Sequence, residues 1–241
     1  MTSRHSGMCD LSQIPEPHFR NYGYIDGKPG KFYNPTQVIV DNQNTSQLLV
    51  TDYKNSAIRT VGIESQIVGT FIHSVNYLNY VEYLTQHPEK GDLYVTTRAY
   101  GVYKIYYNQD GPTVSLIAGQ SDQRGFSDGS FGNSLFNYPR DLGFIGPEVI
   151  LLVDSQNTKA LRVMDLELNK VSTLKKLDNS IYQSFLLTNS TLYISSYEGI
   201  YPLRLPDIDI NKDINSSAIT LFTFSHCLHI AYLLLITLLV Q

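Results

Sequence analysis

Three aspartates in glycine-containing loops are the first residues of this sequence to test for metal chemistry. Asp26 and Asp128 each precede a glycine, and Asp122 lies in the same loop as Asp128. Ca²⁺ prefers carboxylate oxygens, but it needs about six to eight of them, and the spacing here matches no dedicated calcium loop. Asp before Gly is also a turn signal, because the carboxylate can bond the turn backbone while Gly takes a positive φ. We therefore predict that these aspartates cap their own turns, and we expect neither a metal site nor a cofactor.

Catalytic groups are sparse where strands are expected. The only histidines between residues 23 and 205 are His73 and His87. A metallohydrolase site needs several His or carboxylate ligands that converge from different elements. The sequence also contains no Gly-x-Ser-x-Gly elbow, no Cys/His nucleophile pair and no phosphate loop. It therefore predicts a chain that is not an enzyme and has no catalytic residues.

Tyrosine and cationic side chains in the expected turns are candidates for partner binding. Large aromatic side chains and arginine dominate the energetics of interfaces. If the strands pair as meanders around a common axis, the turns between second and third strands share one face with the connections between meanders. On that face we place the predicted partner-binding residues Tyr53, Lys54, Arg98, Tyr100, Arg124 and Tyr197, with Gln156 and Glu198 beside them. The alternative is that they are ordinary solvated turn residues.

Composition narrows the classes of partner. The 241 residues carry a net charge of −4 and only 17% charged residues, so the sequence argues against nucleic acid as a partner. The chain contains 18 Tyr, 16 Gly and 10 Pro, which suits short strands separated by tight turns. Its two cysteines, Cys9 in a polar leader and Cys227 in an apolar tail, do not fix the cellular compartment.

Short apolar runs alternate with turn residues from Gly23 to Leu205. We expect four consecutive meanders of short strands, the last lacking its fourth strand. Their expected ranges are 36–41, 47–51, 57–63 and 66–72; 80–85, 92–97, 102–107 and 113–118; 141–145, 148–153, 160–165 and 171–174; and 182–187, 191–195 and 199–205.

Five features recur in one order in the first and third meanders. The first copy has Gly23-Tyr-Ile-Asp26-Gly27, Phe32-x-x-Pro35, a strand that ends at Asp52, then Asn55 and Ile58-Arg-Thr-Val61. The third has Gly125-Phe-Ser-Asp128-Gly129, Phe136-x-x-Pro139, Asp154, Asn157 and residues 160–164. We expect the later Asp and Asn side chains to bond turn backbone. Repeats of about forty to sixty residues are typical of propeller blades. A β-sandwich of meanders is the alternative.

This ordered motif resembles the NHL repeat, whose family builds β-propellers, often of six blades. The resemblance covers about residues 23–205 and is most specific in the first and third units. It implies an all-β fold, a β-propeller with about four visible four-stranded blades, of which the last is incomplete. With only four units visible, we expect the chain to be the C-terminal part of a larger product. Some propellers of similar repeat type are lyases or hydrolases with a metal in the central channel, so an enzyme whose active-site half is missing is an alternative.

The C-terminal segment predicts membrane attachment. Residues 219–240 contain no Asp, Glu, Lys or Arg and form an expected C-terminal hydrophobic helix long enough to span a bilayer. Small residues at 215–218 precede it, as in a glycolipid-anchor signal. A transmembrane helix and a glycolipid-anchor signal are both left open. The expected division is an irregular leader at 1–22, propeller blades at 23–208, a polar linker at 209–218 and the hydrophobic segment.

Three tripeptides match the acceptor pattern for N-glycosylation, at Asn44, Asn189 and Asn215. Asn44 and Asn189 fall between first and second strands, on the face opposite the predicted partner-binding residues. We therefore predict a membrane-attached glycoprotein at the cell surface that binds a protein or glycan partner through one propeller face. The remaining alternative is a tail-anchored adaptor that faces the cytosol.

Overall fold

The computed structural model describes residues 22–98, 100–121, 123–156, 159–178, 182–188 and 191–204. The leader before residue 22, the acceptors Asn189 and Asn215 and the predicted hydrophobic helix at 219–240 lie outside the described residues. Within the described ranges, no helix combines the length and the apolarity that a membrane span requires.

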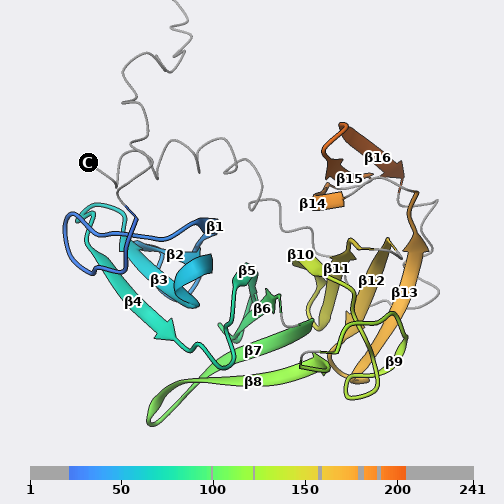
Figure 1. The fold of residues 1–241 in the computed structure, drawn as a ribbon, viewed down its shortest axis with the longest axis horizontal. Coiled ribbons are helices and arrows are strands. Elements are labelled where there is room, and N and C mark those ends of the chain that lie inside the picture. The colour runs from blue at the N-terminus through green and yellow to red at the C-terminus, as the bar shows by residue number, and fades with distance from the viewer. Residues whose placement is uncertain are drawn as a thin grey trace, which may run out of the picture.

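The described chain folds into four antiparallel sheets, which we call the first to fourth blades (Figure 1). The first blade contains β1 (Pro35–Val40), β2 (Gln47–Asp52), β3 (Ala57–Gly62) and β4 (Val68–His73), with the short 3-10 helix η2 (Tyr53–Asn55) in the turn after β2. The second contains β5 (Val81–Gln86), β6 (Leu93–Thr97), β7 (Gly101–Asn108) and β8 (Gly111–Gly119). The third contains β10 (Pro139–Gly146), β11 (Val149–Asp154), β12 (Ala160–Asp165) and β13 (Lys170–Lys176). The fourth contains β14 (Tyr182–Leu187), β15 (Thr191–Ser196) and β16 (Ile200–Arg204).

The predicted all-β arrangement of four blades is confirmed, and each expected strand lies within a few residues of its predicted range. One strand was not expected: the two-residue β9 (Gly129–Ser130), which pairs with the outer edge of β13. In Figure 1 the blades follow one another along an arc, with the first strand of each blade innermost. The innermost strands contact in order, because β5 lies against β1 and β10, and β10 lies against β14.

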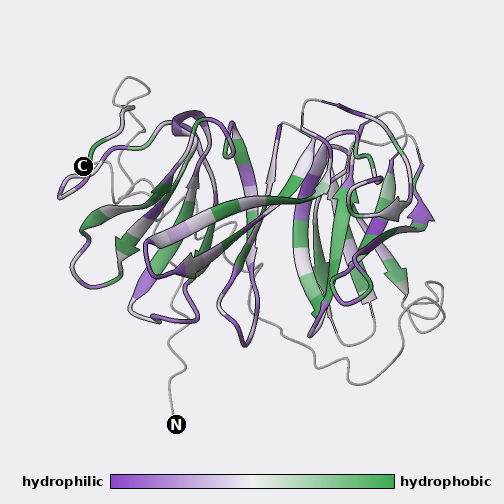
Figure 2. Cartoon of the chain, turned by 90° about the horizontal axis from the view of Figure 1, so that it is seen from below, coloured by the Kyte–Doolittle hydropathy of each residue, from purple (hydrophilic) through white to green (hydrophobic). Residues whose placement is uncertain are grey.

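Apolar layers between consecutive blades form the core. Second strands such as β6 and β11 are buried along their whole length, because both faces of a blade pack on neighbours. One layer joins the first and second blades through Leu49, Ile58 and Leu84. Similar layers join the second blade to the third and the third to the fourth. Hydrophobic residues accordingly gather in the strands, as Figure 2 shows.

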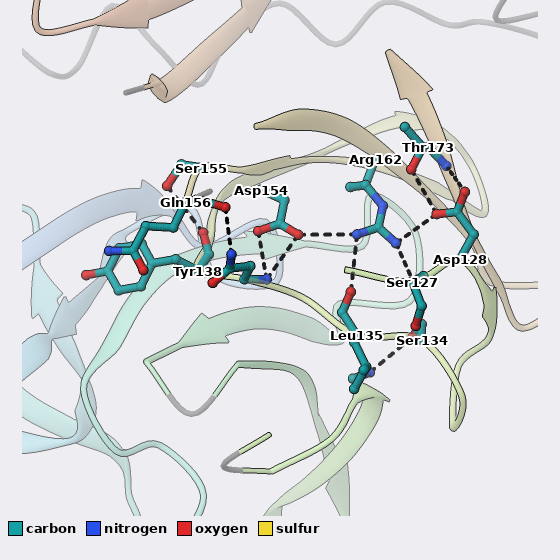
Figure 3. A network of polar contacts seen from close by, with 12 residues as sticks. Ser127, Asp128, Ser134, Leu135, Tyr138, Asp154, Ser155, Gln156, Arg162 and Thr173 are labelled. Atoms are coloured by element: carbon teal, nitrogen blue, oxygen red, sulfur yellow. Dashed lines mark hydrogen bonds and ion pairs between the residues drawn. The ribbon is translucent and has the colours of Figure 1, made fainter. Parts of the chain in front are cut away.

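The recurring Asp-Gly loop is fastened to its blade by a buried arginine (Figure 3). Arg162 is fully buried on β12, and its guanidinium contacts Asp154 at 3.2 Å and Asp128 at 2.8 Å. Asp128 also accepts hydrogen bonds from the backbone N–H and the hydroxyl of Thr173 on β13. The first blade repeats this arrangement, with Arg59 contacting Asp52 at 2.9 Å and Asp26 at 2.5 Å.

This network corrects the prediction that Asp26 and Asp128 cap their own turns. Each carboxylate instead joins its loop to the third and fourth strands of its blade, because a buried guanidinium needs more acceptors than the strand provides. The positive φ predicted for the following glycines is confirmed, at 103° for Gly27 and 145° for Gly129. The described residues contain no group of three or more His, Cys, Asp or Glu that could hold a metal ion.

Candidate functional site where the innermost strands begin

The four innermost strands begin with an irregularity at the same place. Their pairing with the second strand shifts between Pro35 and Gln37, Val81 and Tyr83, Pro139 and Leu142, and Tyr182 and Ser184. In each blade one residue directly follows the first pair and is not paired in the register with the second strand: Thr36, Glu82, Arg140 and Gln183. A bulge re-aims a side chain and is common next to functional sites. All four lie on the face that carries the turns between second and third strands, which we call the 2–3 face.

Side chains next to the bulges fix one blade against the next. The Gln37 amide oxygen accepts a hydrogen bond from the N–H of Leu84 at 2.5 Å. At the corresponding place in the third blade, an Asp141 carboxylate oxygen accepts from the N–H of Phe185 at 3.0 Å and from the hydroxyl of Ser184. The bulged residues of neighbouring blades are therefore held at fixed positions relative to one another.

Glu82 and Arg140 face each other across the boundary of the second and third blades. The closest approach of Glu82 Oε1 and Arg140 Nη2 is 3.9 Å, and the two side chains are 11% and 14% exposed. Burial raises the pKa of Glu82 above its ordinary value, and the charges of Arg140 and Arg98 and the nearby Tyr138 hydroxyl lower it in part. The buried Nε of Arg140 has no hydrogen-bond partner among the described residues. Arg140 therefore keeps a hydrogen-bond donor for a ligand.

An aromatic frame surrounds this pair. Arg98 donates a hydrogen bond from Nε to the Tyr138 hydroxyl at 2.8 Å, and its guanidinium lies 5.5 Å from the Tyr138 ring centroid and 5.6 Å from that of Tyr53. Tyr53 in turn packs against Tyr80, with ring centroids 5.2 Å apart. We refer to Tyr53, Tyr80, Glu82, Arg98, Tyr138 and Arg140 together as the mouth cluster.

Two tyrosines of the mouth cluster have strained backbone. The residue just before the innermost strand has a positive φ in the first three blades: 60° at Asn34, 53° at Tyr80 and 89° at Tyr138. Asn tolerates this region, whereas a bulky residue in it is an outlier. Such strain costs on the order of 1–3 kcal/mol and clusters at functional sites. Two aromatic rings are thus presented on the 2–3 face at a cost in stability.

The structure brings together only some of the predicted partner-binding residues. Tyr53 and Arg98 meet in the mouth cluster, but Tyr53 is 7% exposed and is a supporting wall rather than a surface contact. Tyr197 is 76% exposed and lies in the turn between β15 and β16, on the same 2–3 face. Lys54 lies apart, 4.8 Å from the Tyr33 ring.

The other predicted residues differ in exposure. Tyr100 is partly exposed with a φ of 60°, while Arg124, Gln156 and Glu198 are exposed. Sequence reasoning missed Tyr80, Glu82, Tyr138 and Arg140. Their one common signal is position, at the first residues of an innermost strand or just before it. The acceptor Asn44 is exposed in the β1–β2 turn, on the opposite face from η2.

Comparisons with known proteins agree on the fold. No family model matches the sequence, and no curated protein matches it at a significant level. Among solved structures, the chain is similar to one in a nidogen/laminin complex, with 14% identity, a TM-score of 0.51, and coverage of 71% of this chain and 60% of that one. It is also similar to a gluconolactonase from Xanthomonas campestris, with 11% identity, a TM-score of 0.52, and coverage of 73% and 56%. At such identities the likeness shows the β-propeller fold alone.

The prediction that this chain is not an enzyme is contradicted by these comparisons, because one of the similar propellers is a gluconolactonase. The sequence argument looked for several converging His or carboxylate ligands, a nucleophile motif or a phosphate loop, and did not consider a single buried carboxylate. Glu82, a buried carboxylate with a raised pKa, can take part in acid–base chemistry without a histidine. The scarcity of histidines and nucleophile motifs therefore does not exclude catalysis.

Proposed function

We propose that this propeller is a recognition module that binds a protein or glycan partner through its 2–3 face, centred on the mouth cluster. The observation that carries the proposal is the Glu82–Arg140 pair, whose carboxylate and guanidinium lie 3.9 Å apart inside a frame of strained tyrosines. Interfaces place Tyr and Arg near a desolvated centre within a polar rim. Arg98 and Tyr197 supply such a rim here, because both are exposed.

We further propose that the chain is an NHL-type propeller attached to the cell surface through residues 219–240 and glycosylated at Asn44. The repeated loop, strand and turn motif supports the first part, and the exposed Asn44 supports the last. Surface labelling of cells that express the full chain tests the attachment. Retention of the label after phospholipase treatment would favour a spanning helix over a glycolipid anchor, and no surface label at all would overturn the surface location.

The binding role is tested by staining cells with the fluorescent propeller and measuring bound protein by flow cytometry. The double variant Arg98→Gln with Tyr197→Ala should stain far more weakly than the wild type, because both exposed contacts of the 2–3 face are lost. The matched control is Lys104→Gln, which removes a cation from β7 that pairs with Asp92 instead. Equal staining by the double variant and the wild type would overturn the proposal.

A hydrolase that acts on a lactone or an ester is the second candidate, favoured by the raised pKa of Glu82 beside Arg140. Glu82 would accept a proton from an attacking water, and Arg140 would stabilise the developing oxyanion. Acid release from gluconolactone, followed in a pH-stat, tests this activity. A rate above the spontaneous one that Glu82→Gln abolishes would support a hydrolase, and an identical rate in wild type and variant would dismiss it.

A further inference from the structure

We propose that the mouth cluster binds a sugar ring through two adjacent hydroxyl groups, one held by Glu82 and the other by Arg140. The inference rests on the proposed recognition function and names the chemistry of the ligand.

The spacing of Glu82 and Arg140 suits two hydroxyl groups of a ligand. The 3.9 Å between Glu82 Oε1 and Arg140 Nη2 exceeds the roughly 2.7–3.2 Å of a direct N–H···O hydrogen bond. Hydroxyls on neighbouring carbons can bridge such a pair, because one donates its proton to the carboxylate while the other accepts from the guanidinium. The neighbouring Nε of Arg140, buried and without a partner among the described residues, offers a further donor.

The charges of the mouth cluster favour a neutral ligand. Arg98 and Arg140 are cations and Glu82 is an anion, so a bare metal ion would meet two like charges in the centre of the cluster, and a carboxylate would pair with the arginines but leave Glu82 facing a like charge. A hydroxyl group donates and accepts at once. A neutral polyol can therefore satisfy all three side chains, which a group of a single charge cannot.

Tyr80 and Tyr138 supply aromatic rings for the apolar face of a sugar. Sugars present an apolar face of C–H groups beside their hydroxyls, and aromatic rings pack against such a face. Tyr80 is 40% exposed, Tyr138 is partly exposed, and both have a positive φ just before an innermost strand. The guanidinium of Arg98 is held in place by Tyr138 through Nε, and the residue is exposed. Its terminal NH₂ groups can therefore reach a ligand hydroxyl.

The test uses isothermal titration calorimetry of the full chain in detergent, with methyl glucoside, mannoside and galactoside as probes. At least one should bind, and a deoxy analogue that lacks one hydroxyl of the bound pair should bind roughly tenfold or more weakly, because a buried polar group loses its partner. A glycan array run in parallel separates the two sources of the ring. Binding of simple glycosides identifies a free sugar, and binding only to oligosaccharides identifies a glycan chain.

Two variants test the residues. Glu82→Gln keeps the shape of the side chain and removes its charge, and Arg98→Gln changes an exposed side chain. Each should weaken sugar binding roughly tenfold or more, while Lys104→Gln should leave it unchanged. If Glu82→Gln fails to fold, as judged by thermal unfolding, Arg98→Gln alone decides whether the cluster is the site.

The outcomes separate this inference from the proposed function. If the folded chain binds neither glycosides nor array glycans but still stains cells in an Arg98-dependent way, the partner is a protein and the sugar site is refuted. If it neither binds sugars nor stains cells, both proposals fail. Sugar binding that is unaffected by both variants would also overturn the inference.

Discussion

The buried arginines of the first and third blades each pair with a buried carboxylate, so their loss should cost stability. We predict that Arg162→Met lowers the free energy of unfolding by roughly 3–5 kcal/mol, because it leaves a buried carboxylate without a counter-charge. Burial already raises the pKa of Asp154 to about 7 against the opposing charge of Arg162. Urea unfolding measures the change. The control is Lys104→Met, whose pair with Asp92 is partly exposed and should cost less than about 1 kcal/mol. Equal losses in both variants would contradict the prediction.

Glu82 predicts a dependence of stability on pH. Burial raises its pKa in the folded chain above the value in the unfolded chain, so the folded state binds the proton more tightly. Its contribution is therefore fully present below the unfolded pKa and is lost as pH rises through the folded pKa. Glu82→Gln mimics the protonated form. The stability of this variant relative to wild type should thus increase as pH rises, measured by urea unfolding at a series of pH values. A difference that stays constant with pH would show that the pKa of Glu82 is not raised.

At the scale of elements, the strands could be predicted and the mouth cluster could not. Val, Ile, Leu and Tyr runs between turn residues determine strands locally, which is why every expected strand is present within a few residues of its predicted range. Glu82 and Arg140 look like ordinary polar positions of strands in the sequence. Their bulges, and the positive φ of Tyr138, depend on how neighbouring blades converge, and no local pattern encodes that. The same limit explains why Tyr53 was expected on the surface.

The side chains that join blades predict local rather than global loosening. Asp141→Ala leaves the N–H of Phe185 and the hydroxyl of Ser184 without their acceptor, at a cost of about 1–3 kcal/mol. Amide hydrogen exchange should quicken in β14 and remain unchanged in β1 to β4. The matched variant Gln37→Ala should instead quicken exchange at Leu84, because it opens the boundary between the first and second blades. Uniform acceleration in either variant would mean that the blades do not open separately.

For the whole molecule, the turns on the two faces have different roles. On the face opposite the mouth cluster, neighbouring turns bond one another: Asn42 donates to Gln86 and to the His87 carbonyl, and the buried His87 ring contacts Glu148 of the third blade. Lys90 also pairs with Glu148. The side chains of these turns are therefore engaged in contacts between blades. The 2–3 face instead carries strained tyrosines and a charged pair held apart, which is why we place recognition there.

Glycosylation tests this division of faces in the intact protein. Asn44 is exposed in the β1–β2 turn, so expression through the secretory pathway should place a glycan there, and that glycan should leave staining of cells unchanged. The pair Tyr197→Asn with Gly199→Ser creates a new acceptor on the 2–3 face. Its glycan should abolish staining, because it covers the 2–3 face. Gel mobility before and after glycosidase reports occupancy, and Asn44→Gln identifies the native site. Removal of the added glycan should raise staining only to the level of a Tyr197→Asn variant without the acceptor, because the Tyr197 contact is still absent, whereas full binding with the new glycan in place would locate recognition elsewhere on the propeller.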